Sequence, residues 1–374
     1  MCGANSPAPE FEPILAAIEA GRAEIEDHLA YFRGRLADAS CETPPEVPRL
    51  SISSFSSLYQ SNQHEHGHHF VIHQHNHPRA GVHYDLRLQF SESSSMSFAV
   101  PKGLPGNPNS RSIGRLAVET RVHNYWNHLI ESASSKTGSL LIWDTGTYEI
   151  LPRKMKQPGK KGVIPSPRIT DDESDFDPEP TRSSESEKSD NEKLIAAFQT
   201  RYIRLRLHGT KLPKNYTIIL RLPNNEIIKP PTARRKTRKT HTTSATISTD
   251  SEDEPNIQQE NLNQEQNLDT DTDEGTETRR HNAYPGSTND IGSIHQRHWF
   301  MMLDRQSSGF VHDQSGGEKS KWVRGARGEG FGSFLVRGRE YERSLVTGRL
   351  SRDVESDEGV EGFVGRGGWI GIED

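Results

Sequence analysis

The sequence predicts a mainly β fold, an antiparallel barrel or sandwich with an N-terminal helix and long disordered insertions. Short segments in which apolar and polar residues alternate indicate strands, and Gly-Pro, Asn-Pro and Asp-Thr-Gly turns separate these segments. The hydrophobic fraction of 31% is low for a fully packed chain of 374 residues, so we expect a good part of the chain to stay unpacked.

The elements follow one another along the chain. Apolar residues at helical spacing, from Phe11 to Phe32, predict an N-terminal helix that ends before Pro44. The segment 82–90 places His, Asp, Arg and Gln on one face and Tyr, Leu, Leu and Phe on the other, which is the period of a strand with one face in a core. Further strands are expected over 70–75, 97–100, 116–120, 140–143, 147–151 and 299–304, with a hairpin over 201–222.

Loss of apolar residues marks the segments that we expect to be disordered. Residues 154–195 turn from basic to Ser-rich and acidic, and the basic run 229–239 precedes an acidic stretch rich in Asn and Gln. We therefore divide the chain into an N-terminal helical extension (1–48), a barrel core (49–222) interrupted by the insertion 154–195, a linker (223–290), a returning strand of the barrel (291–310) and a Gly/Arg-rich tail (311–374).

Charge and composition exclude several classes of protein. The net charge is −6, so a contact with nucleic acid must come from a local basic patch rather than from the field of the whole molecule. The sequence has no signal-peptide pattern and no apolar run of about 18 residues, so we expect no membrane partner. Cys2 and Cys41 are the only cysteines, which excludes a disulfide scaffold and a thiolate zinc module.

Three side chains on one face of the strand over 82–90 suggest a metal site. His83 and Asp85 lie two residues apart, so both project to the same side and can reach one cation. A histidine of the preceding segment supplies the third ligand: His73, His75 or His77. Two imidazoles and a carboxylate suit manganese, zinc, iron or cobalt, and three protein ligands leave open positions, as in catalytic sites. Arg87 continues this face and is suited to bind a phosphate oxygen.

Several short segments, taken in order, resemble one family. The first two are Phe70-Val-Ile-His-Gln-His75 and His83-Tyr-Asp-Leu-Arg-Leu88. The others are Phe98-Ala-Val-Pro-Lys-Gly103, Arg115-Leu-Ala-Val118 with His123, Leu141-Ile-Trp-Asp-Thr-Gly-Thr-Tyr148, Leu205-Arg-Leu-His-Gly-Thr-Lys-Leu212 and Trp299-Phe-Met-Met-Leu-Asp304. Together they resemble the 3′-phosphoesterase domain of bacterial DNA ligase D. No ligase or polymerase motif occurs, which indicates a stand-alone version, and the long Ser-rich and acidic insertions suggest a fungal relative.

The resemblance implies a closed or nearly closed antiparallel barrel of about eight strands. It also implies a manganese-dependent hydrolase, with Zn²⁺ or Co²⁺ as possible substitutes, that heals DNA 3′ ends by removing a 3′ phosphate and 3′-terminal ribonucleotides. By the same resemblance, His83 and Asp85 are metal ligands, and Arg87 and His123 act on the phosphate in catalysis. Additional positive charge at the phosphate is expected from Arg115 and Lys102.

The first metal ligand differs from the family pattern in its spacing. His77 keeps the family spacing to the second ligand, whereas His75 keeps the register from Phe70. We expect His75 to be the ligand, with His77 as the alternative, because the segment 78–81 can hold a two-residue insertion. His73 stands where the family usually has glutamine.

A second difference concerns the family's active-site tyrosine, which lies four residues after the position of His123. Here that position is Asn127, and Tyr125 lies two residues earlier. We expect Tyr125 to substitute as a catalytic residue from a shifted loop, or part of the activity to be lost.

Two other functions stay open. One is a catalytically weakened DNA-end-binding module of the same fold, given Asn127. The other is a non-heme iron oxygenase, because two histidines and an aspartate also form the facial triad of such enzymes. The segment 124–131 contains no arginine, and such an arginine would be expected beside the distal histidine to hold a co-substrate.

The expected partners follow from the resemblance. They are DNA or RNA-tipped DNA 3′ ends and a DNA ligase or repair complex, with the chain acting as a monomer. The basic run 234–239 is typical of a nuclear-import signal or of a DNA-tethering arm, and also of a solvated basic segment. We therefore expect a nuclear protein, with a cytoplasmic location as the alternative.

Overall fold

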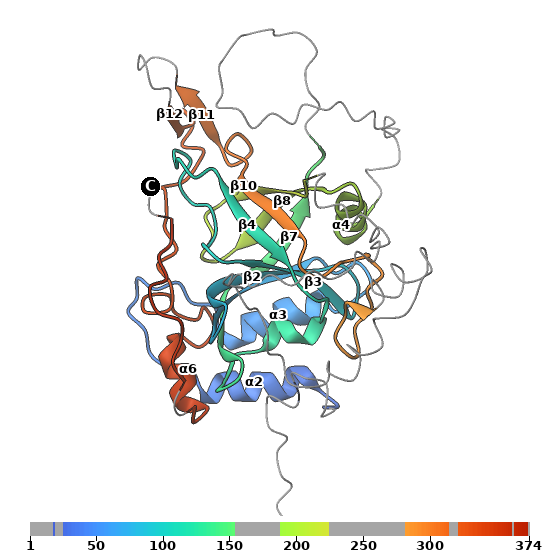
Figure 1. Ribbon diagram of the computed structural model, residues 1–374, viewed down its shortest axis with the longest axis vertical. Helices are drawn as coiled ribbons and strands as arrows, with labels where there is room; N and C mark the ends of the chain where they lie inside the picture. The colour runs from blue at the N-terminus through green and yellow to red at the C-terminus, as the bar shows by residue number, and fades with distance from the viewer. Residues whose placement is uncertain are drawn as a thin grey trace, which may run out of the picture.

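Eight antiparallel strands close into a barrel in the computed structural model of the chain (Figure 1). Their order is β1-β2-β3-β4-β10-β9-β8-β7, and the barrel closes where β7 pairs with β1. This confirms the predicted fold class. The strands are β1 (His69–His77), β2 (Gly81–Gln89), β3 (Ser94–Val100), β4 (Gly114–Glu119), β7 (Gly138–Ile150), β8 (Tyr202–Gly209), β9 (Thr217–Arg221) and β10 (His298–Leu303).

The structure describes residues 18, 25–153, 188–223, 281–313, 321–360 and 363–372. Most of the expected insertion and linker, including the basic run 234–239, and the first part of the expected N-terminal helix lie outside these residues. Besides the barrel strands, the described elements are α2 (His28–Asp38), α3 (Ile52–Ser61), β5 (His123–Asn124), the 3₁₀ helix η1 (Tyr125–Leu129), β6 (Ser132–Ser134), α4 (Asp190–Gln199), β11 (Phe310–Asp313), β12 (Lys321–Arg324) and α6 (Ser351–Asp357).

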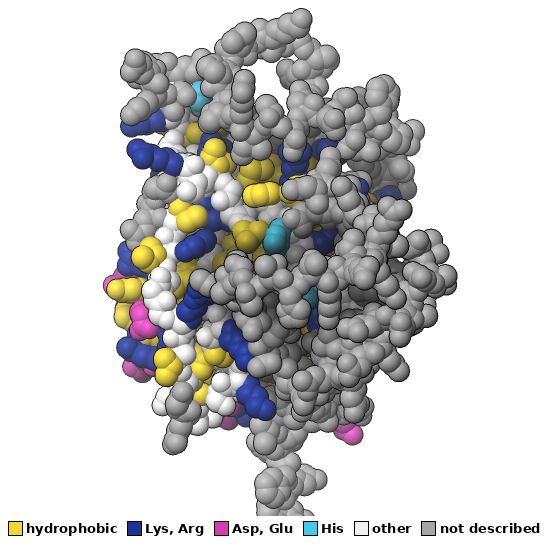
Figure 2. Space-filling model, in the orientation of Figure 1, with side chains coloured by type: hydrophobic (Ala, Val, Ile, Leu, Met, Phe, Trp, Pro, Cys, Tyr) yellow, Lys and Arg dark blue, Asp and Glu magenta, His cyan; other side chains and the backbone are white. Residues whose placement is uncertain are grey.

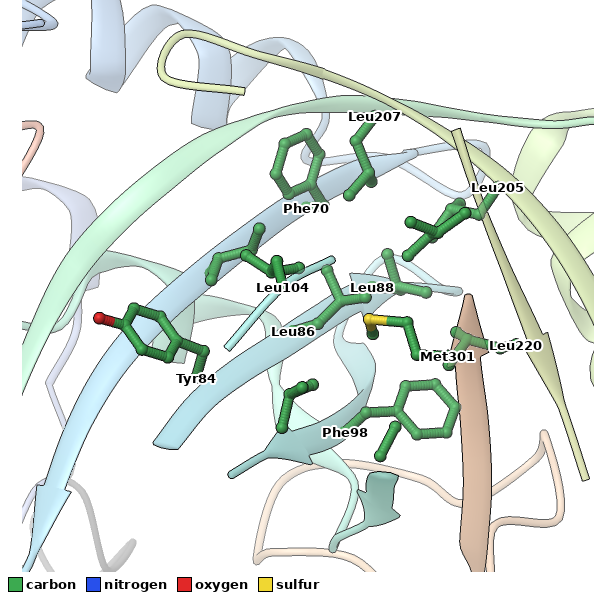
Figure 3. Close-up of a cluster of buried hydrophobic side chains, with 14 of the residues drawn as sticks. Phe70, Tyr84, Leu86, Leu88, Phe98, Leu104, Leu205, Leu207, Leu220 and Met301 are labelled. Carbon is green, nitrogen blue, oxygen red and sulfur yellow. The ribbon is translucent and has the colours of Figure 1, made fainter. Parts of the chain in front are cut away.

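The inward faces of the strands form the main hydrophobic core. Leu86, Phe98 and Met301 come from three strands and are completely buried. Figure 3 shows these side chains and their neighbours pointing toward one another between the strands. Because side chains alternate along a strand, the residues between them face out of the barrel. On β2, the outward residues are therefore His83, Asp85 and Arg87.

A second, smaller core lies outside the barrel wall. Val71 of β1 and Ile142 of β7 pack there with Phe32 of α2 and Phe55 of α3. Figure 1 shows α2 and α3 stacked below β2 and β3. The predicted helix from Phe11 to Phe32 is correct only in its last part, because residues 25–27 are not helical and α2 begins at His28 and ends at Asp38. The sequence analysis also missed α3, whose first turn is capped by the Ser51 hydroxyl accepting the Ser54 N–H.

The prediction of separate strands over 140–143 and 147–151 was wrong, because β7 runs through both. The Asp-Thr-Gly sequence between them does not turn the chain. Instead the buried Asp144 carboxylate accepts N–H groups from Thr145 and from Thr210, Lys211 and Leu212 of the neighbouring loop. These bonds tie the loop after β8 to an unbroken β7.

The expected insertion 154–195 extends too far, because α4 begins at Asp190. Ser189 and Glu192 form a capping box at its N-terminus, a signal that is readable in the sequence. Leu194 and Phe198 are buried in the core cluster. A helix that buries apolar side chains on the barrel belongs to the folded domain.

The C-terminal region also packs more than a Gly/Arg-rich tail is expected to. Glu131 and Arg349 form a buried ion pair at 3.0 Å, with side chains 0% and 4% exposed. Trp369 lies against Tyr84 and donates its indole N–H to the Pro101 carbonyl. The tail therefore contributes a buried electrostatic contact and a ring contact to the barrel, which composition alone does not reveal.

Candidate metal and phosphate site

The register of β1 and β2 places the predicted metal ligands next to one another. His75 is directly opposite His83, and His73 is directly opposite Asp85. All four side chains are on the outward face of the barrel wall, because Tyr84 and Leu86, which alternate with His83 and Asp85, are buried in the core. The pleat of two paired strands therefore brings the cluster together without help from a loop.

His75, His83 and Asp85 form a compact group of three potential metal ligands. One ligand atom of each lies within 4.8 Å of those of the other two. The Asp85 carboxylate oxygens lie 3.4 Å from His75 Nδ1 and 3.4 Å from His83 Nε2. Two imidazole nitrogens and one carboxylate are a donor set that suits a divalent transition metal.

The other nitrogen of each imidazole is already engaged. His75 Nε2 lies 2.8 Å from the Thr137 carbonyl, and His83 Nδ1 lies 3.0 Å from the Gly81 carbonyl. A carbonyl oxygen only accepts, so these nitrogens carry the protons. The nitrogens that face Asp85 then hold free lone pairs in the neutral rings, which is the arrangement that backbone acceptors impose on metal-binding histidines. The residues present therefore fit a metal ion.

Electrostatics keep the carboxylate ionised. Burial alone would raise the pKa of Asp85, but His83, His75 and Arg87 outweigh it and hold the pKa below its ordinary range. Burial lowers the pKa of His83, against the opposing effect of Asp85. An ionised aspartate is the form of this side chain that binds a metal ion.

A polar surface continues from these ligands along the outward face. Arg87 is opposite Ser97 of β3, and His123 of β5 is opposite Ser95. Arg87 also donates from Nη1 to the Asn127 carbonyl at 3.3 Å. Burial and then Arg87 lower the pKa of His123, which places the two side chains within electrostatic reach. The predicted phosphate-binding pair, Arg87 and His123, is thus brought beside the metal ligands.

Several buried atoms of this surface have no hydrogen-bond partner among the described residues. They are both ring nitrogens of His73, the hydroxyls of Ser95 and Ser97, His123 Nδ1, Asn127 Oδ1 and His128 Nε2. Leaving a buried polar group unpaired costs about 1–3 kcal/mol. A concentration of such atoms on one face is the property expected of a surface that binds a polar ligand or ordered water.

His77 and Tyr125 border this cluster, with ring centroids 5.5 Å from His75 and 5.1 Å from His128, but their polar atoms bond elsewhere. His77 Nδ1 accepts the N–H groups of Arg79 and Ala80 in the turn between β1 and β2, at 3.2 and 3.1 Å. Tyr125 stacks on Tyr59 and donates its hydroxyl to the Tyr59 carbonyl at 2.9 Å. The expectation that Tyr125 replaces the family tyrosine does not fit this placement, because its hydroxyl serves the contact between η1 and α3.

Lys102 and Arg115, expected to add positive charge at the phosphate, are placed differently from Arg87. Lys102 is exposed, and its Nζ donates to the Ile370 carbonyl at 3.3 Å. Arg115 lies two residues before Ala117, which is in the barrel core, and donates to the Gly114 carbonyl at 3.5 Å. Arg115 is therefore on the inward side of the wall, opposite the face that carries Asp85.

Sequence reasoning missed part of the buried polar surface. His128 is fully buried beside His69, with their Nδ1 atoms 2.9 Å apart. The sequence analysis singled out neither residue. Only the return of η1 onto the barrel wall brings His128 to β1, and no short-range pattern indicates that contact.

Within the described part of the chain, no helix is long and apolar enough to cross a bilayer.

Comparison with known proteins agrees with the resemblance that the sequence motifs indicate. Residues 73–220 match the family model described as DNA Ligase D 3′-phosphoesterase domain. Multifunctional non-homologous end joining protein LigD of Mycolicibacterium smegmatis is 34% identical over 144 residues, which cover 37% of this chain and 16% of that protein. The protein of the same name from Mycobacterium bovis is 34% identical over 131 residues, covering 34% and 15%.

The chain thus spans only about a sixth of the length of these curated relatives (16% and 15%). The relatives are bacterial and give no support to the expected fungal origin. The matched region contains the strands that carry His75, His83, Asp85 and Arg87. Over residues 73–220, the barrel of this chain is therefore similar in sequence to the 3′-phosphoesterase domain family of DNA ligase D.

Proposed function

We propose that this chain is a metal-dependent phosphoesterase that heals DNA 3′ ends in repair. Its substrates would be 3′-phosphate ends and 3′-terminal ribonucleotides. The observation that carries the proposal is the convergence of His75, His83 and Asp85 with Arg87 on one face of a barrel that matches this family.

His75, His83 and Asp85 would hold the metal ion, and Mn²⁺ is the ion that we propose. The ion would act as a Lewis acid toward a phosphate oxygen and would supply an activated water. We favour His75 over His77 as the first ligand, because the Nδ1 of His77 already accepts two backbone N–H groups.

Arg87 and His123 would act on the phosphate itself. The Arg87 guanidinium is nearly buried, and a buried charge offsets negative charge on a phosphoryl group more strongly than a solvated one. A bound phosphate dianion raises the pKa of a neighbouring imidazole. This effect would let His123 carry a proton to the leaving oxygen.

Contacts with the DNA backbone would come from basic side chains outside the cluster. On the face shown in Figure 2, Lys and Arg side chains are interspersed with hydrophobic ones, and few acidic side chains are visible among the described residues. Binding through such contacts releases counterions, so the affinity for DNA should fall as the salt concentration rises.

The decisive experiment uses a primer strand with a 3′ phosphate and a matched strand with a 5′ phosphate. In Mn²⁺, the wild-type chain should release phosphate from the 3′ end only. Asp85→Asn and His83→Ala should abolish the release, while His208→Ala, which changes an exposed histidine of β8, should retain it. Activity that survives the Asp85 and His83 substitutions would contradict the metal assignment.

One observation favours a second candidate, a DNA-end-binding module with weakened turnover. Asn127 stands at the position of the family tyrosine, and the hydroxyl of Tyr125 is committed to Tyr59. Tight binding of 3′-phosphate ends without phosphate release, in any of Mn²⁺, Zn²⁺ or Co²⁺, would support the binding module. The family match favours both candidates over the iron oxygenase.

We further propose a nuclear location and an association with a DNA ligase or repair complex, with the chain itself a monomer. The basic run 234–239, outside the described residues, would direct nuclear import. Deleting residues 229–239 should move a tagged protein to the cytoplasm, and a tagged protein that stays nuclear would exclude this signal.

A further inference from the structure

A line of hydrogen bonds runs from the barrel wall to the buried polar surface. Thr145 of β7 donates its hydroxyl proton to the Phe70 carbonyl at 2.8 Å. The same oxygen lies 2.8 Å from His69 Nε2, and His69 Nδ1 lies 2.9 Å from His128 Nδ1. The line therefore has four members, of which His128 is the last.

The first bond fixes the position of every proton in the line. A threonine hydroxyl has one proton, and the Phe70 carbonyl only accepts, so His69 Nε2 must donate to the threonine oxygen. Burial lowers the pKa of His69 to about 3, so its ring is neutral and its Nδ1 carries no proton. His128 Nδ1 must therefore donate to His69 Nδ1.

These proton positions leave the other ring nitrogen of His128, Nε2, without a proton. Burial lowers the pKa of His128, so its ring is neutral too, and a ring protonated at Nδ1 has a bare Nε2. That atom is buried and has no hydrogen-bond partner among the described residues. Arg87 donates to the carbonyl of the adjacent residue Asn127 at 3.3 Å, and Arg87, His73 and His123 lie within electrostatic reach of the His128 ring. His128 thus presents a fixed, unused acceptor to the phosphate-binding part of the site.

We infer that His128 Nε2 accepts a hydrogen bond from a hydroxyl of the bound substrate, or from a water that the substrate holds, and that His128 is a specificity-determining residue. The identity of the ligand rests on the proposed function, whereas the proton positions rest on the hydrogen bonds alone. His69 and Thr145 are positioning residues, because they act only through His128.

The chemistry of the ligand follows from the chemistry of the atom. A deprotonated phosphate oxygen is an acceptor and would be repelled by a bare imidazole nitrogen, so the phosphate oxygens belong to Arg87 and His123. A ribose hydroxyl or a water carries a proton to donate. A site built to accept such a proton rejects a ligand that lacks it, since the acceptor is then left unpaired.

The first test reads the protons directly. The full chain with ¹⁵N-labelled histidine side chains, in EDTA to prevent turnover, should show one protonated and one bare nitrogen in both His69 and His128, with Nε2 the bare atom of His128. A protonated His128 Nε2 would overturn the inference. Thr145→Val should produce a mixture of tautomers at both rings, because the group that fixes the His69 proton is gone.

The second test follows the ligand. In the same metal-free samples, a primer ending in a ribonucleotide should shift the His128 Nε2 resonance. An all-deoxy primer of equal length with a 3′ phosphate separates the two donors: no shift identifies a ribose hydroxyl, and an equal shift identifies a held water. No shift with either primer, although both bind, would overturn the inference. This test stands even if the chain hydrolyses neither primer, which would refute the proposed function alone.

The third test uses two matched variants. His128→Asn keeps a polar atom near Nδ1 but removes the acceptor at Nε2, whereas His128→Gln places an amide oxygen near Nε2. We expect a roughly tenfold loss of kcat/KM in the asparagine variant, the size of one hydrogen bond, and recovery in the glutamine variant. His208→Asn, at an exposed histidine, is the control. An asparagine variant that folds and stays within about twofold of wild type on both primers would overturn the inference.

Discussion

The choice between His75 and His77 as a metal ligand leads to a quantitative prediction. His75 is on β1, and the other two ligands are on β2, so the unfolded chain does not hold the site together. A metal that binds only the folded state adds about 2.7 kcal/mol of stability at a concentration of 100 times its Kd. For a domain of this size, that corresponds to a rise in Tm of roughly 5–11 °C.

His75→Ala should remove most of this rise. Changing a residue that merely supports a metal ligand typically costs 10–100-fold in affinity, so losing the ligand should cost about 100-fold or more. At the same metal concentration, the stabilisation then falls to about 0.4 kcal/mol, a rise of roughly 1–2 °C. The assay is differential scanning calorimetry of each variant in Mn²⁺ and in EDTA.

His77→Ala is the matched control. It removes the acceptor for the N–H groups of Arg79 and Ala80, so the Tm in EDTA should fall, but the rise on adding Mn²⁺ should stay. The reasoning is refuted if His75→Ala keeps the full rise or if His77→Ala loses it.

Three further outcomes are expected. Arg349→Ala should destabilise the fold by about 3–5 kcal/mol in urea unfolding, because it leaves a buried carboxylate unpaired; Arg352→Ala, at a side chain that is 66% exposed, should cost little. Tyr125→Phe should cost about 1 kcal/mol of stability and leave the proposed 3′-phosphatase activity unchanged, since its hydroxyl bonds to backbone; a large loss of activity would reinstate it as catalytic. Burial lowers the pKa of His69 to about 3 in the folded chain, so the fold is most stable above pH 6.5, where the ring is neutral in both states. As the pH falls from 6.5 toward 3, the free energy of unfolding should decrease by up to about 1.4 kcal/mol per pH unit. Urea unfolding at pH 4–7 should show this slope, and His69→Gln should remove the part of the slope that comes from His69.

Much of the barrel was predictable because period-two alternation is a local property of the chain. The segment 82–90 showed both faces of β2, and the structure buries its apolar face in the core as expected. The Asp-Thr-Gly turn failed for a physical reason. Asp144 binds the backbone of a loop more than 60 residues away, and a sequence pattern does not show which backbone a carboxylate will bind.

The residues of the candidate site also fall into two groups: those that local spacing predicts and those that only non-local contacts bring in. His83, Asp85 and Arg87 share a strand face, so their proximity followed from spacing alone. His128 and Asn127 enter the site only because η1 folds back onto β1 and β2, a non-local contact. Tyr125 was expected to be catalytic because of its position shortly after His123. In a 3₁₀ helix each residue turns the side-chain direction by about a third of a turn, so a shift along the chain changes which side chain faces the site.

His75, the first of the proposed metal ligands, depends for its position on the far end of the chain. The residues on either side of His75 are both held by α6: Gln74 accepts the Ser351 hydroxyl at 2.7 Å, and Asn76 donates to Glu355 at 3.0 Å. These two side chains point to the other face of β1, so they fix the strand without touching the metal site. The region interpreted from composition as a tail thus sets the backbone position of His75. Any loss of α6 should therefore weaken metal binding before it unfolds the barrel.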